Sequence, residues 1–231
     1  MKYENPRQKI DEHTLMVNEI FYSIQGESSF AGKPCVFIRL TYCNLRCTYC
    51  DTRYAFFEGK PMSIDEVNQM IQHFCCQTVE ITGGEPLLQP GVYPLMRRLC
   101  DQGYLVLLET SGSKSVENVD PRVIKILDFK CPSSGMSNKN LYENMNFLLP
   151  HDEVKFVIGT REDYDWSKAL ILKNKLHEKV NNILFSPVFE AIEPVEIVNW
   201  ILTDKLQQQI PNIRFQLQLQ KLIWLPETRG V

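Results

Sequence analysis

The sequence lacks any run of apolar residues long enough to cross a membrane, and it lacks an excess of charge of either sign. Its first residues, 1–6, are polar, which is not the pattern of a signal peptide. Lys and Arg number 25 and Asp and Glu 28, so the formal net charge is −3 and no nucleic-acid or membrane surface is indicated. We therefore expect a cytoplasmic protein with neither nucleic acid nor membrane among its partners.

The lack of an export signal also bears on the 8 cysteines, since thiols stay reduced in the cytoplasm. They are predicted to be metal ligands or free thiols rather than disulfides. Those in apolar strand or helix patterns are expected in the core: Cys35, Cys75, Cys76 and Cys100. The 4 histidines are scattered, and none is paired with another cysteine at zinc-finger spacing.

A glycine-rich dinucleotide fingerprint, an internal repeat and a long linker are all missing. Strand and helix patterns instead alternate along most of the 231 residues, which predicts a parallel sheet with right-handed crossovers. With about six strand–helix units, this pattern favours a partial α/β barrel over a Rossmann sheet. We expect a loose polar arm over residues 1–16 and a single domain over residues 17–231.

Predicted strands cover residues 17–22, 35–40, 79–82, 104–108, 123–128, 153–158, 182–185 and 213–219. Predicted helices cover residues 63–76, 90–102, 139–148, 161–178 and 193–208, the first opened by a Ser-x-x-Glu capping box. Polar, glycine-bearing segments follow the strands. Barrel enzymes place their chemistry at the carboxyl ends of the strands, so these segments are the candidates for a site.

Three cysteines follow the second predicted strand in the spacing C-x3-C-x2-C: Cys43, Cys47 and Cys50. Structural zinc ions and fully ligated iron–sulfur clusters usually take four protein ligands, so three thiolates leave one metal position open. We favour an iron–sulfur cluster whose open iron binds a substrate or second cofactor. A zinc site and unliganded thiols are the alternatives. Thr52, after Asp51, offers the hard oxygen that magnesium accepts, unless the pair is an ordinary turn.

Three further segments follow strands. The turn at residues 83–86, Gly-Gly-Glu-Pro, leaves main-chain groups accessible to a ligand, although such a turn can be purely structural. Residues 109–112, Glu-Thr-Ser-Gly, offer hydroxyl groups to the sugar or amino-acid part of a cofactor. Residues 128–130 end in Lys130, which either meets a ligand carboxylate or is a solvated lysine at a strand end.

The turn Gln25-Gly26-Glu27 suits a flat heterocycle. Gln25 has a donor and an acceptor, Glu27 has acceptors, and the glycine lets a ring lie against the main chain. These groups match the pyrimidinone edge of a pterin or guanine. Arg39 interrupts a buried strand and therefore needs an anion, either a substrate carboxylate or a protein carboxylate.

Together these segments resemble one family, the 7-carboxy-7-deazaguanine synthases, radical S-adenosylmethionine (SAM) enzymes of queuosine and deazapurine biosynthesis. The similar patterns are F-x-S-I-Q-G-E, F-I-R-L, C-x3-C-x2-C-D-T, T-G-G-E-P and E-T-S-G. The cysteine spacing is shared by the whole superfamily, whereas Q-G-E and D-T narrow the resemblance. It implies an incomplete (β/α) barrel of the radical SAM type, a homodimer, and a [4Fe-4S] cluster, SAM and Mg²⁺ as cofactors.

The resemblance also implies a role for each matching residue. The implied cluster ligands are Cys43, Cys47 and Cys50, and the implied magnesium ligand is Thr52. The implied SAM contacts are Tyr49, Asp51, Gly84, Ser111, Asp128, Phe129 and Lys130. The implied substrate contacts are Ile24, Gln25, Gly26, Glu27, Arg39 and Thr82. The implied reaction converts 6-carboxy-5,6,7,8-tetrahydropterin to 7-carboxy-7-deazaguanine and ammonia, with a flavodoxin- or ferredoxin-like electron donor.

One position departs from the family pattern. Gln220 stands where the resembling sequences often carry histidine, and glutamine does not titrate, so a proton-transfer role there is in doubt. The tail, residues 226–231, is expected to fold over the pocket. The alternative within the superfamily is an activase that generates a glycyl radical on a partner enzyme. The alternative from another class is a zinc-stabilised binding protein.

Overall fold

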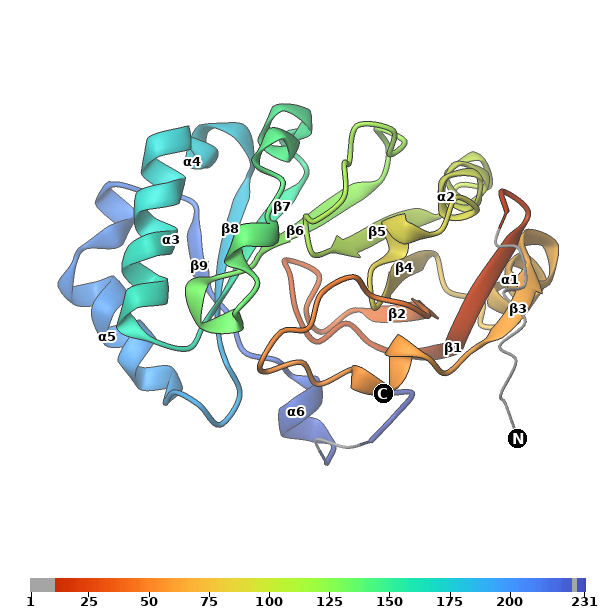
Figure 1. Cartoon of the computed structure of the whole chain (residues 1–231), viewed down its shortest axis with the longest axis horizontal. Helices are drawn as coiled ribbons and strands as arrows, with labels where there is room; N and C mark the ends of the chain where they lie inside the picture. The colour runs from red at the N-terminus through yellow and green to blue at the C-terminus, as the bar shows by residue number, and fades with distance from the viewer. Residues whose placement is uncertain (1–10, 226–227) are drawn as a thin grey trace.

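The computed structural model describes residues 11–225 and 228–231, and its centre is one sheet (Figure 1). The strand order is β3-β1-β2-β4-β5-β6-β7-β8-β9. Neighbours from β2 onward run parallel, whereas β1 is antiparallel to both β2 and β3. The order is linear and the sheet does not close, so the predicted incomplete barrel is confirmed, with an antiparallel edge added.

The strands are β1 Thr14–Ile24, β2 Pro34–Leu40, β3 Lys60–Ser63, β4 Thr78–Gly83, β5 Leu105–Thr110, β6 Ile124–Phe129, β7 Glu153–Ile158, β8 Asn182–Pro187 and β9 Ile213–Phe215. The helices are α1 Ile64–Gln72, α2 Val92–Asp101, α3 Arg161–Asn174, α4 Leu176–Lys179, α5 Pro194–Thr203 and α6 Gln220–Ile223. In Figure 1, α1 and α2 lie at one end of the curved sheet and α3, α4 and α5 at the other.

Strand alternation separates a core face from an inner face. In β7, Val154, Phe156 and Ile158 join the main hydrophobic core with the apolar sides of the helices. Lys155 and Val157 point to the opposite, inner face. The same period of two turns polar side chains inward from five neighbouring strands: Arg39, Glu80, Thr82, Glu109, Asp128 and Lys155. The inner face therefore carries the chemistry and the outer face the stability.

Several element boundaries differ from the prediction. The predicted helix at 139–148 is two short 3-10 turns, because the Asn140 and Asn144 side chains bond main-chain groups of neighbouring loops instead of supporting a helix. The predicted helix 161–178 is divided at Lys175, whose φ is 52°. The last strand ends at Phe215 rather than at residue 219.

The predicted amino-terminal arm is too long. Strand β1 begins at Thr14, and Leu15 and Val17 are fully buried, so the last residues of the 1–16 arm belong to the sheet. Residues 1–10 of that arm lie outside the described residues. The capping box that opens α1 is confirmed, since the Ser63 hydroxyl accepts from the Glu66 N–H and the Glu66 carboxylate accepts from the Ser63 N–H.

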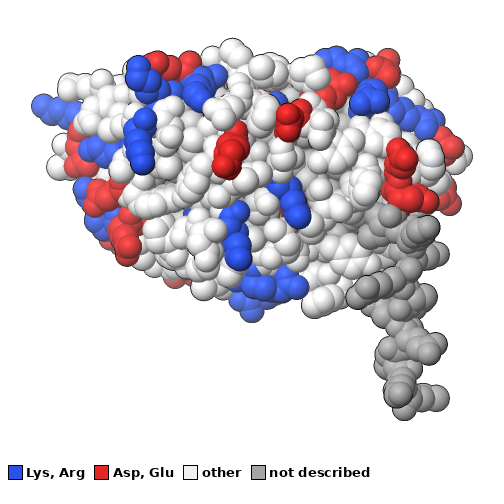
Figure 2. All heavy atoms as spheres, turned by 45° about the horizontal axis from the view of Figure 1, so that its top comes forward, with Lys and Arg blue, Asp and Glu red and all other residues white. Residues whose placement is uncertain are grey.

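The cysteines predicted in the core differ in exposure. Cys35 is buried and Cys76 and Cys100 are half-buried, but Cys75 is exposed. The apolar helix pattern that suggested burial ends before Cys75, whose φ of 49° lies beyond the end of α1. No helix in the described part of the chain is long and apolar enough to cross a membrane. On the face in Figure 2, acidic and basic side chains are interspersed and neither sign forms a broad stripe.

Candidate active site

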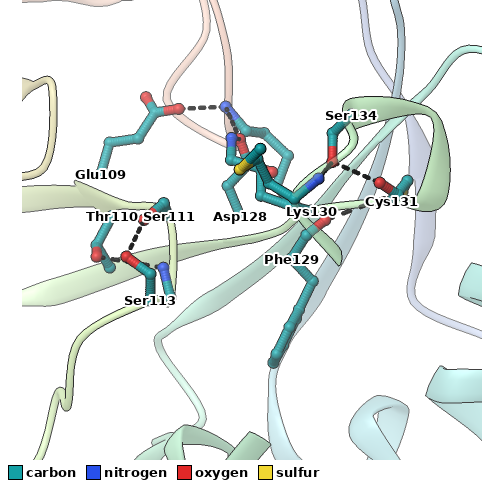
Figure 3. A network of polar contacts seen from close by, with 12 residues as sticks. Glu109, Thr110, Ser111, Ser113, Asp128, Phe129, Lys130, Cys131 and Ser134 are labelled. Carbon is teal, nitrogen blue, oxygen red and sulfur yellow. Dashed lines mark hydrogen bonds and ion pairs between the residues drawn. The ribbon is translucent and has the colours of Figure 1, made fainter. Parts of the chain in front are cut away.

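A cavity of about 680 Å³ lies on the inner face, at the carboxyl ends of the strands. Sixteen of the seventeen predicted site residues line it: Ile24, Gln25, Gly26, Glu27, Arg39, Cys43, Cys47, Tyr49, Cys50, Asp51, Thr52, Thr82, Gly84, Ser111, Asp128 and Lys130. The exception is Phe129, which is fully buried in the core and stacks on Phe156 with 5.9 Å between ring centroids. Its neighbours Asp128 and Lys130 face the cavity, so strand alternation turns Phe129 away, as Figure 3 shows.

The cysteine loop, residues 41–52, forms one wall of the cavity. Cys43, Cys47 and Cys50 are half-buried and all line the cavity, while Leu45 anchors the loop with only 2% of its surface exposed. Burial raises the pKa of all three thiols, and the Lys130 ammonium acts in the opposite direction. A bound cation would therefore be needed to keep three thiolates together on this wall.

The donors on that wall suit a metal group with an open position. Among the described residues, no three His, Cys, Asp or Glu side chains already stand in a metal-coordinating arrangement. The described lining of the cavity contains three cysteines, no fourth cysteine and no histidine. A closed tetrahedral zinc site therefore lacks its fourth nitrogen or sulfur ligand, which disfavours the zinc alternative.

The Gly-Gly-Glu-Pro turn packs directly against the start of the cysteine loop. The Glu85 N–H donates to the Tyr42 carbonyl at 2.8 Å and the Gly84 N–H to the Leu40 carbonyl at 3.1 Å. A side chain at position 84 would collide with Tyr42 and Cys43, so this close approach requires glycine. The turn is thus part of the wall and not a free loop.

Glu85, which the sequence did not single out, organises the end of β5. Its fully buried carboxylate accepts from the Thr110 hydroxyl at 2.8 Å, the Ser111 N–H at 2.9 Å and the Ser111 hydroxyl at 2.5 Å. The Ser111 hydroxyl also contacts that of Ser113 at 2.9 Å, the pair that Figure 3 shows beside Thr110. Ser111 is therefore oriented by the protein before any ligand is present.

Lys130 and Asp128 form a buried ion pair at the end of β6, with 2.7 Å between Nζ and Oδ2. Burial opposes the lysine charge, but the Asp128 carboxylate raises the pKa of Lys130. The solvated-lysine alternative is therefore wrong. Asp128 Oδ1 and the Tyr49 hydroxyl are buried and have no hydrogen-bond partner among the described residues. Two polar atoms at the cavity thus remain available to a ligand.

A buried charge cluster, which we call the cavity floor, consists of Glu80, Glu109, Asp128 and Lys155. The Lys155 ammonium, with 3% of its side chain exposed, bonds Glu109 and lies 3.7 Å from Asp128 Oδ2. It also binds Glu27, from the loop after β1, at 3.0 Å. Burial opposes its charge, but the Glu109 and Glu27 carboxylates raise the pKa of Lys155 well above its ordinary value. Lys155 was not predicted as a site residue.

Glu80 differs from the other floor carboxylates because its hydrogen-bond partner is the neutral Gln25 amide rather than Lys155. Burial, with the nearby Glu109 and Glu27 carboxylates, raises the pKa of Glu80 well above its ordinary value. Glu80 therefore keeps its proton to a higher pH than a free carboxyl does. Gln25 is fixed at both ends, since its side-chain oxygen accepts from the Glu27 N–H at 2.9 Å.

Arg39 has a protein carboxylate as its partner. Its Nε lies 2.7 Å from Glu19 Oε1, which also accepts from the Tyr54 hydroxyl at 2.9 Å. The guanidinium carbon lies 5.5 Å from the centre of the Phe21 ring and 5.9 Å from that of Tyr54. Arg39 still lines the cavity, so Glu19 orients it toward that space.

The carboxyl-terminal segment, described over residues 216–225 and 228–231, lines the cavity on the side of the Gln25-Gly26-Glu27 turn. Gln218 Nε2 and Gln220 Nε2 donate to Glu27 Oε1 at 2.9 and 3.0 Å. The Lys221 ammonium lies 2.6 Å from Asp51 Oδ2. Although burial acts against it, the Lys221 ammonium lowers the pKa of Asp51, whose Oδ1 accepts from the Thr52 hydroxyl at 2.9 Å.

The end of this segment reaches the cavity as well. Arg229 pairs with Glu58 at 2.7 Å and lies 3.9 Å from the centre of the Tyr54 ring. Thr228, Arg229 and Val231 belong to the cavity lining, which is where the predicted tail was expected. Residues 226 and 227 lie outside the described residues.

Comparison with known proteins gives relatives over nearly the whole chain. A model of the radical SAM superfamily matches residues 37–201. The 7-carboxy-7-deazaguanine synthase of Koribacter versatilis (strain Ellin345) is 44% identical, covering 94% of this chain and 100% of the relative. The enzyme of the same name from Chlorobaculum tepidum is 47% identical, covering 95% and 99%.

One solved structure, the crystal structure of QueE from Escherichia coli, is similar in fold. Its TM-score is 0.71 at 23% sequence identity, and the match covers 89% of this chain and 94% of that one. At that identity the likeness concerns the arrangement of strands and helices.

Proposed function

We propose the function from the family: the chain belongs to the radical SAM superfamily and, within it, to the 7-carboxy-7-deazaguanine synthases. In this proposal it converts 6-carboxy-5,6,7,8-tetrahydropterin to 7-carboxy-7-deazaguanine with release of ammonia. The observation that carries this proposal is one cavity shared by the three-cysteine wall and the Gln25-Gly26-Glu27 turn. A radical generated at the wall would form within reach of a ring held at the turn.

Membership of the radical SAM superfamily implies a [4Fe-4S] cluster and SAM. Cys43, Cys47 and Cys50 would hold the cluster, and the cavity's lack of a fourth thiol or imidazole fits one iron left open to SAM. When bound, these groups would supply one-electron radical chemistry for the removal of hydrogen from the substrate, while the chain's own residues hold and orient them.

The chain's own groups would then bind and orient SAM. Gly84 brings main-chain groups to the cavity, and Ser111 is already oriented by Glu85. The buried Lys130 ammonium suits the SAM carboxylate, and the unpartnered Asp128 Oδ1 and Tyr49 hydroxyl suit donor or acceptor groups of the cofactor. Phe129 supports this end from the core and does not contact the ligand through its side chain.

The other end of the cavity would bind the pterin. Its 2-amino-4-oxo ring is rich in N–H donors, which carboxylate oxygens accept. Glu27 and Glu109 provide such oxygens, with Lys155 balancing their charge, and Thr82 and Ile24 complete the lining. Arg39, oriented by Glu19, would meet the substrate carboxylate. Glu80 lies beside these groups, and burial and the neighbouring carboxylates raise its pKa well above the ordinary value.

We also propose Mg²⁺ at Thr52, next to the Asp51 carboxylate. Both lie on the cysteine loop and line the cavity, and both present oxygen, the donor that magnesium prefers. Bound there, the ion would supply Lewis-acid polarisation of substrate oxygens. Lys221 occupies Asp51 in this structure, so magnesium binding and the docking of the carboxyl-terminal segment are linked in this proposal.

The proposal extends to the enzyme's setting. We propose a cytoplasmic homodimer that receives its electron from a flavodoxin- or ferredoxin-like protein, as the family resemblance implies. The chain from Thr14, where β1 begins, would act as a single catalytic domain, with the carboxyl-terminal segment excluding water from the cavity. A glycyl-radical activase must admit a segment of a partner protein, and no observation favours that reading over a small polar ligand.

Product analysis tests the proposal. The protein, reconstituted anaerobically with iron and sulfide, is incubated with the carboxytetrahydropterin, SAM, Mg²⁺ and dithionite. We expect 7-carboxy-7-deazaguanine and 5′-deoxyadenosine to appear together in mass-spectrometric analysis. Traces of 5′-deoxyadenosine without deazaguanine would refute the substrate, and a colourless protein with one zinc and no acid-labile sulfide would refute the cluster.

A further inference from the structure

The cysteine loop is attached to a strand-end loop on the far side of the cavity. Thr48, next to Cys47, donates from its N–H to the Ser134 carbonyl at 3.1 Å and from its hydroxyl to the Ser133 carbonyl at 2.8 Å. The cysteine loop begins at the end of β2, whereas the serine loop, residues 131–136, follows β6. Strands β4 and β5 lie between these two strands, so the contact bridges the open sheet.

The serine loop is itself held by a buried carboxylate that does not line the cavity. Asp163, in the first turn of α3, is 0% exposed and accepts from the Ser133 N–H at 2.9 Å and from the Ser133 hydroxyl. Its Oδ2 also accepts from the N–H groups of Gly159 at 2.8 Å and Thr160 at 3.1 Å. Hydrogen bonds to an ionised acceptor are about twice as strong as neutral ones.

The two bonds to Ser133 exceed what a helix cap requires. Thr160 and Asp163 already form a complete capping box, in which each side chain accepts from the other's N–H. Two further bonds therefore tie α3 to the serine loop. That loop is rigid at its next residue too, because the fully buried Ser134 donates to the Cys131 carbonyl at 2.5 Å and accepts from the Met136 N–H at 3.0 Å.

We propose that Asp163 and Ser133 are positioning residues that hold the cysteine loop, through Thr48, in the shape that retains the cluster. The chain of contacts runs from α3 to the serine loop and then to the residue after Cys47. No disulfide joins the three half-buried cysteines, so when the metal leaves, the shape of the loop depends on its attachments to the neighbouring loops. A fixed loop keeps the donors together and makes their separation slower.

A second attachment supports the same reading on the other side of the loop. The Asn44 amide exchanges hydrogen bonds with the Ser113 hydroxyl, at 3.0 and 3.2 Å, and Ser113 lies in the loop after β5. The fully buried Asn144 fixes that loop by bonding Val116, Gly112 and Lys114 main-chain groups. The cysteine loop is thus held by two neighbouring strand-end loops, each fixed by a buried side chain from a later part of the chain.

The test rests on the proposed cluster but measures its retention rather than turnover. Anaerobically reconstituted protein is mixed with an iron chelator, and iron release is followed by absorbance. Removing one hydrogen bond corresponds to roughly a two- to tenfold change, so we expect Ser133→Ala and Thr48→Val to release iron faster by that factor. Because both substitutions break the same path of contacts, the double variant should release iron at about the rate of either single variant.

The matched control is Thr160→Ala. It removes the hydroxyl that accepts from the Asp163 N–H at the start of α3, and it leaves the bonds between Ser133 and the Asp163 carboxylate in place. We expect lower unfolding free energy of the cluster-free protein but wild-type iron release. If Thr160→Ala loses iron as fast as Ser133→Ala, or if Ser133→Ala and Thr48→Val release it at the wild-type rate, the positioning role is refuted. A wild-type protein that takes up no cluster refutes the proposed function instead.

Discussion

At the scale of single residues, the site depends on how buried charges are paired. Glu27 and Glu109 share the Lys155 ammonium, whereas Glu80 bonds the Gln25 amide. Burial and the nearby carboxylates raise the pKa of Glu80 well above its ordinary value. Burial raises the pKa of Glu109 as well, although Lys155 acts against it, whereas Lys155 and hydrogen bonds lower the pKa of Glu27 against the effect of burial.

We expect Glu80→Gln to change how stability depends on pH. The pKa of Glu80 is raised in the folded protein, so between the ordinary carboxyl value and the folded value the native state binds more protons than the unfolded state. Stability therefore falls as pH rises through that window, and the amide removes this loss. Urea unfolding of the cluster-free protein from pH 5 to 8 measures it. An unchanged pH dependence would contradict a raised pKa at Glu80.

The matched control has the opposite sign. Hydrogen bonds from the Ser63 main chain and side chain lower the pKa of Glu66, which is exposed at the start of α1. Its contribution to stability is present above the unfolded pKa and is lost as pH falls through the folded pKa. Glu66→Gln should therefore lower stability at neutral pH and flatten the acid side of the profile.

We expect Lys155→Met to be one of the most damaging single substitutions. It leaves Glu27 and Glu109, whose side chains are 12% and 25% exposed, without their cation. Breaking a fully buried pair costs about 3–5 kcal/mol, so we expect a loss at or below the lower end of that range. Urea unfolding at pH 7 measures the loss. Because protonation relieves the carboxylates, the deficit should shrink toward pH 5, and a deficit that stays constant with pH would exclude this cause.

At the scale of elements, the cysteine loop and the carboxyl-terminal segment are both attached to the rest of the domain by hydrogen bonds or ion pairs. The cysteine loop is bonded to the loops after β4, β5 and β6. The carboxyl-terminal segment is bonded to the Gln25-Gly26-Glu27 turn and to Asp51. The catalytic wall and its cover are therefore joined to each other as well as to the strands.

We expect Cys47→Ala to abolish SAM cleavage while the protein remains folded, because two thiolates do not retain the cluster. Acid-labile sulfide, 5′-deoxyadenosine formation and circular dichroism measure the three quantities. Cys75→Ala is the control, since that thiol is exposed and does not line the cavity. Wild-type turnover in Cys47→Ala would remove that residue from the ligand set.

We expect Lys221→Met to loosen the carboxyl-terminal segment. The two ion pairs of this segment differ mainly in their cations: Lys221 is 12% exposed and its partner Asp51 48%, whereas Arg229 is 51% exposed and its partner Glu58 57%. Exposed pairs contribute about 0–1 kcal/mol, so Arg229→Gln is the mild comparison. Limited proteolysis should cleave the segment of Lys221→Met several times faster than that of Arg229→Gln. A difference of about 1.4 kcal/mol in the free energy of opening corresponds to a tenfold difference in rate. Equal rates would show that Lys221 does not hold the segment.

At the scale of the whole molecule, the sequence predicted the fold well where strands are buried on both faces. Runs such as 106–108 are continuous and apolar, and Val106 and Leu108 do join the main core. The site was found through segments at strand ends. Lys155 and Glu80 were missed because each lies within a buried strand, where a polar residue can equally be paired structurally; Lys155 interrupts an apolar run just as Arg39 does.

The errors have a common physical origin in side chains that bond distant main-chain or side-chain groups. Residues 213–219 alternate like a strand, but the Gln218 side chain donates to Glu27, which lies 191 residues earlier. A pattern of neighbouring residues cannot predict such a distant partner. Asn144 likewise leaves a helix-like pattern to fix the loop after β5. Phe129 was assigned with its neighbours as a segment, although alternation along β6 sends it to the core.

We expect SAM to stabilise the protein that contains the cluster and not the cluster-free protein. A ligand that binds only the folded state, present at one hundred times its dissociation constant, adds about 2.7 kcal/mol. SAM should therefore raise the unfolding temperature of reconstituted protein and leave that of cluster-free protein nearly unchanged. Equal shifts in both would indicate that SAM binding does not use the cluster.

Gly26 and Gln220 pack directly against each other although they lie near opposite ends of the chain. A side chain at position 26 would occupy the space of the Gln220 amide, and the Leu219 N–H donates to the Gly26 carbonyl at 3.1 Å. The Gln220 amide is the far end of a flexible side chain and can turn away, but the Gln220 main-chain nitrogen lies 3.1 Å from where a Cβ at position 26 would stand. In a set of descendants of this chain, a larger residue at position 26 should therefore occur more often together with a smaller one at position 220.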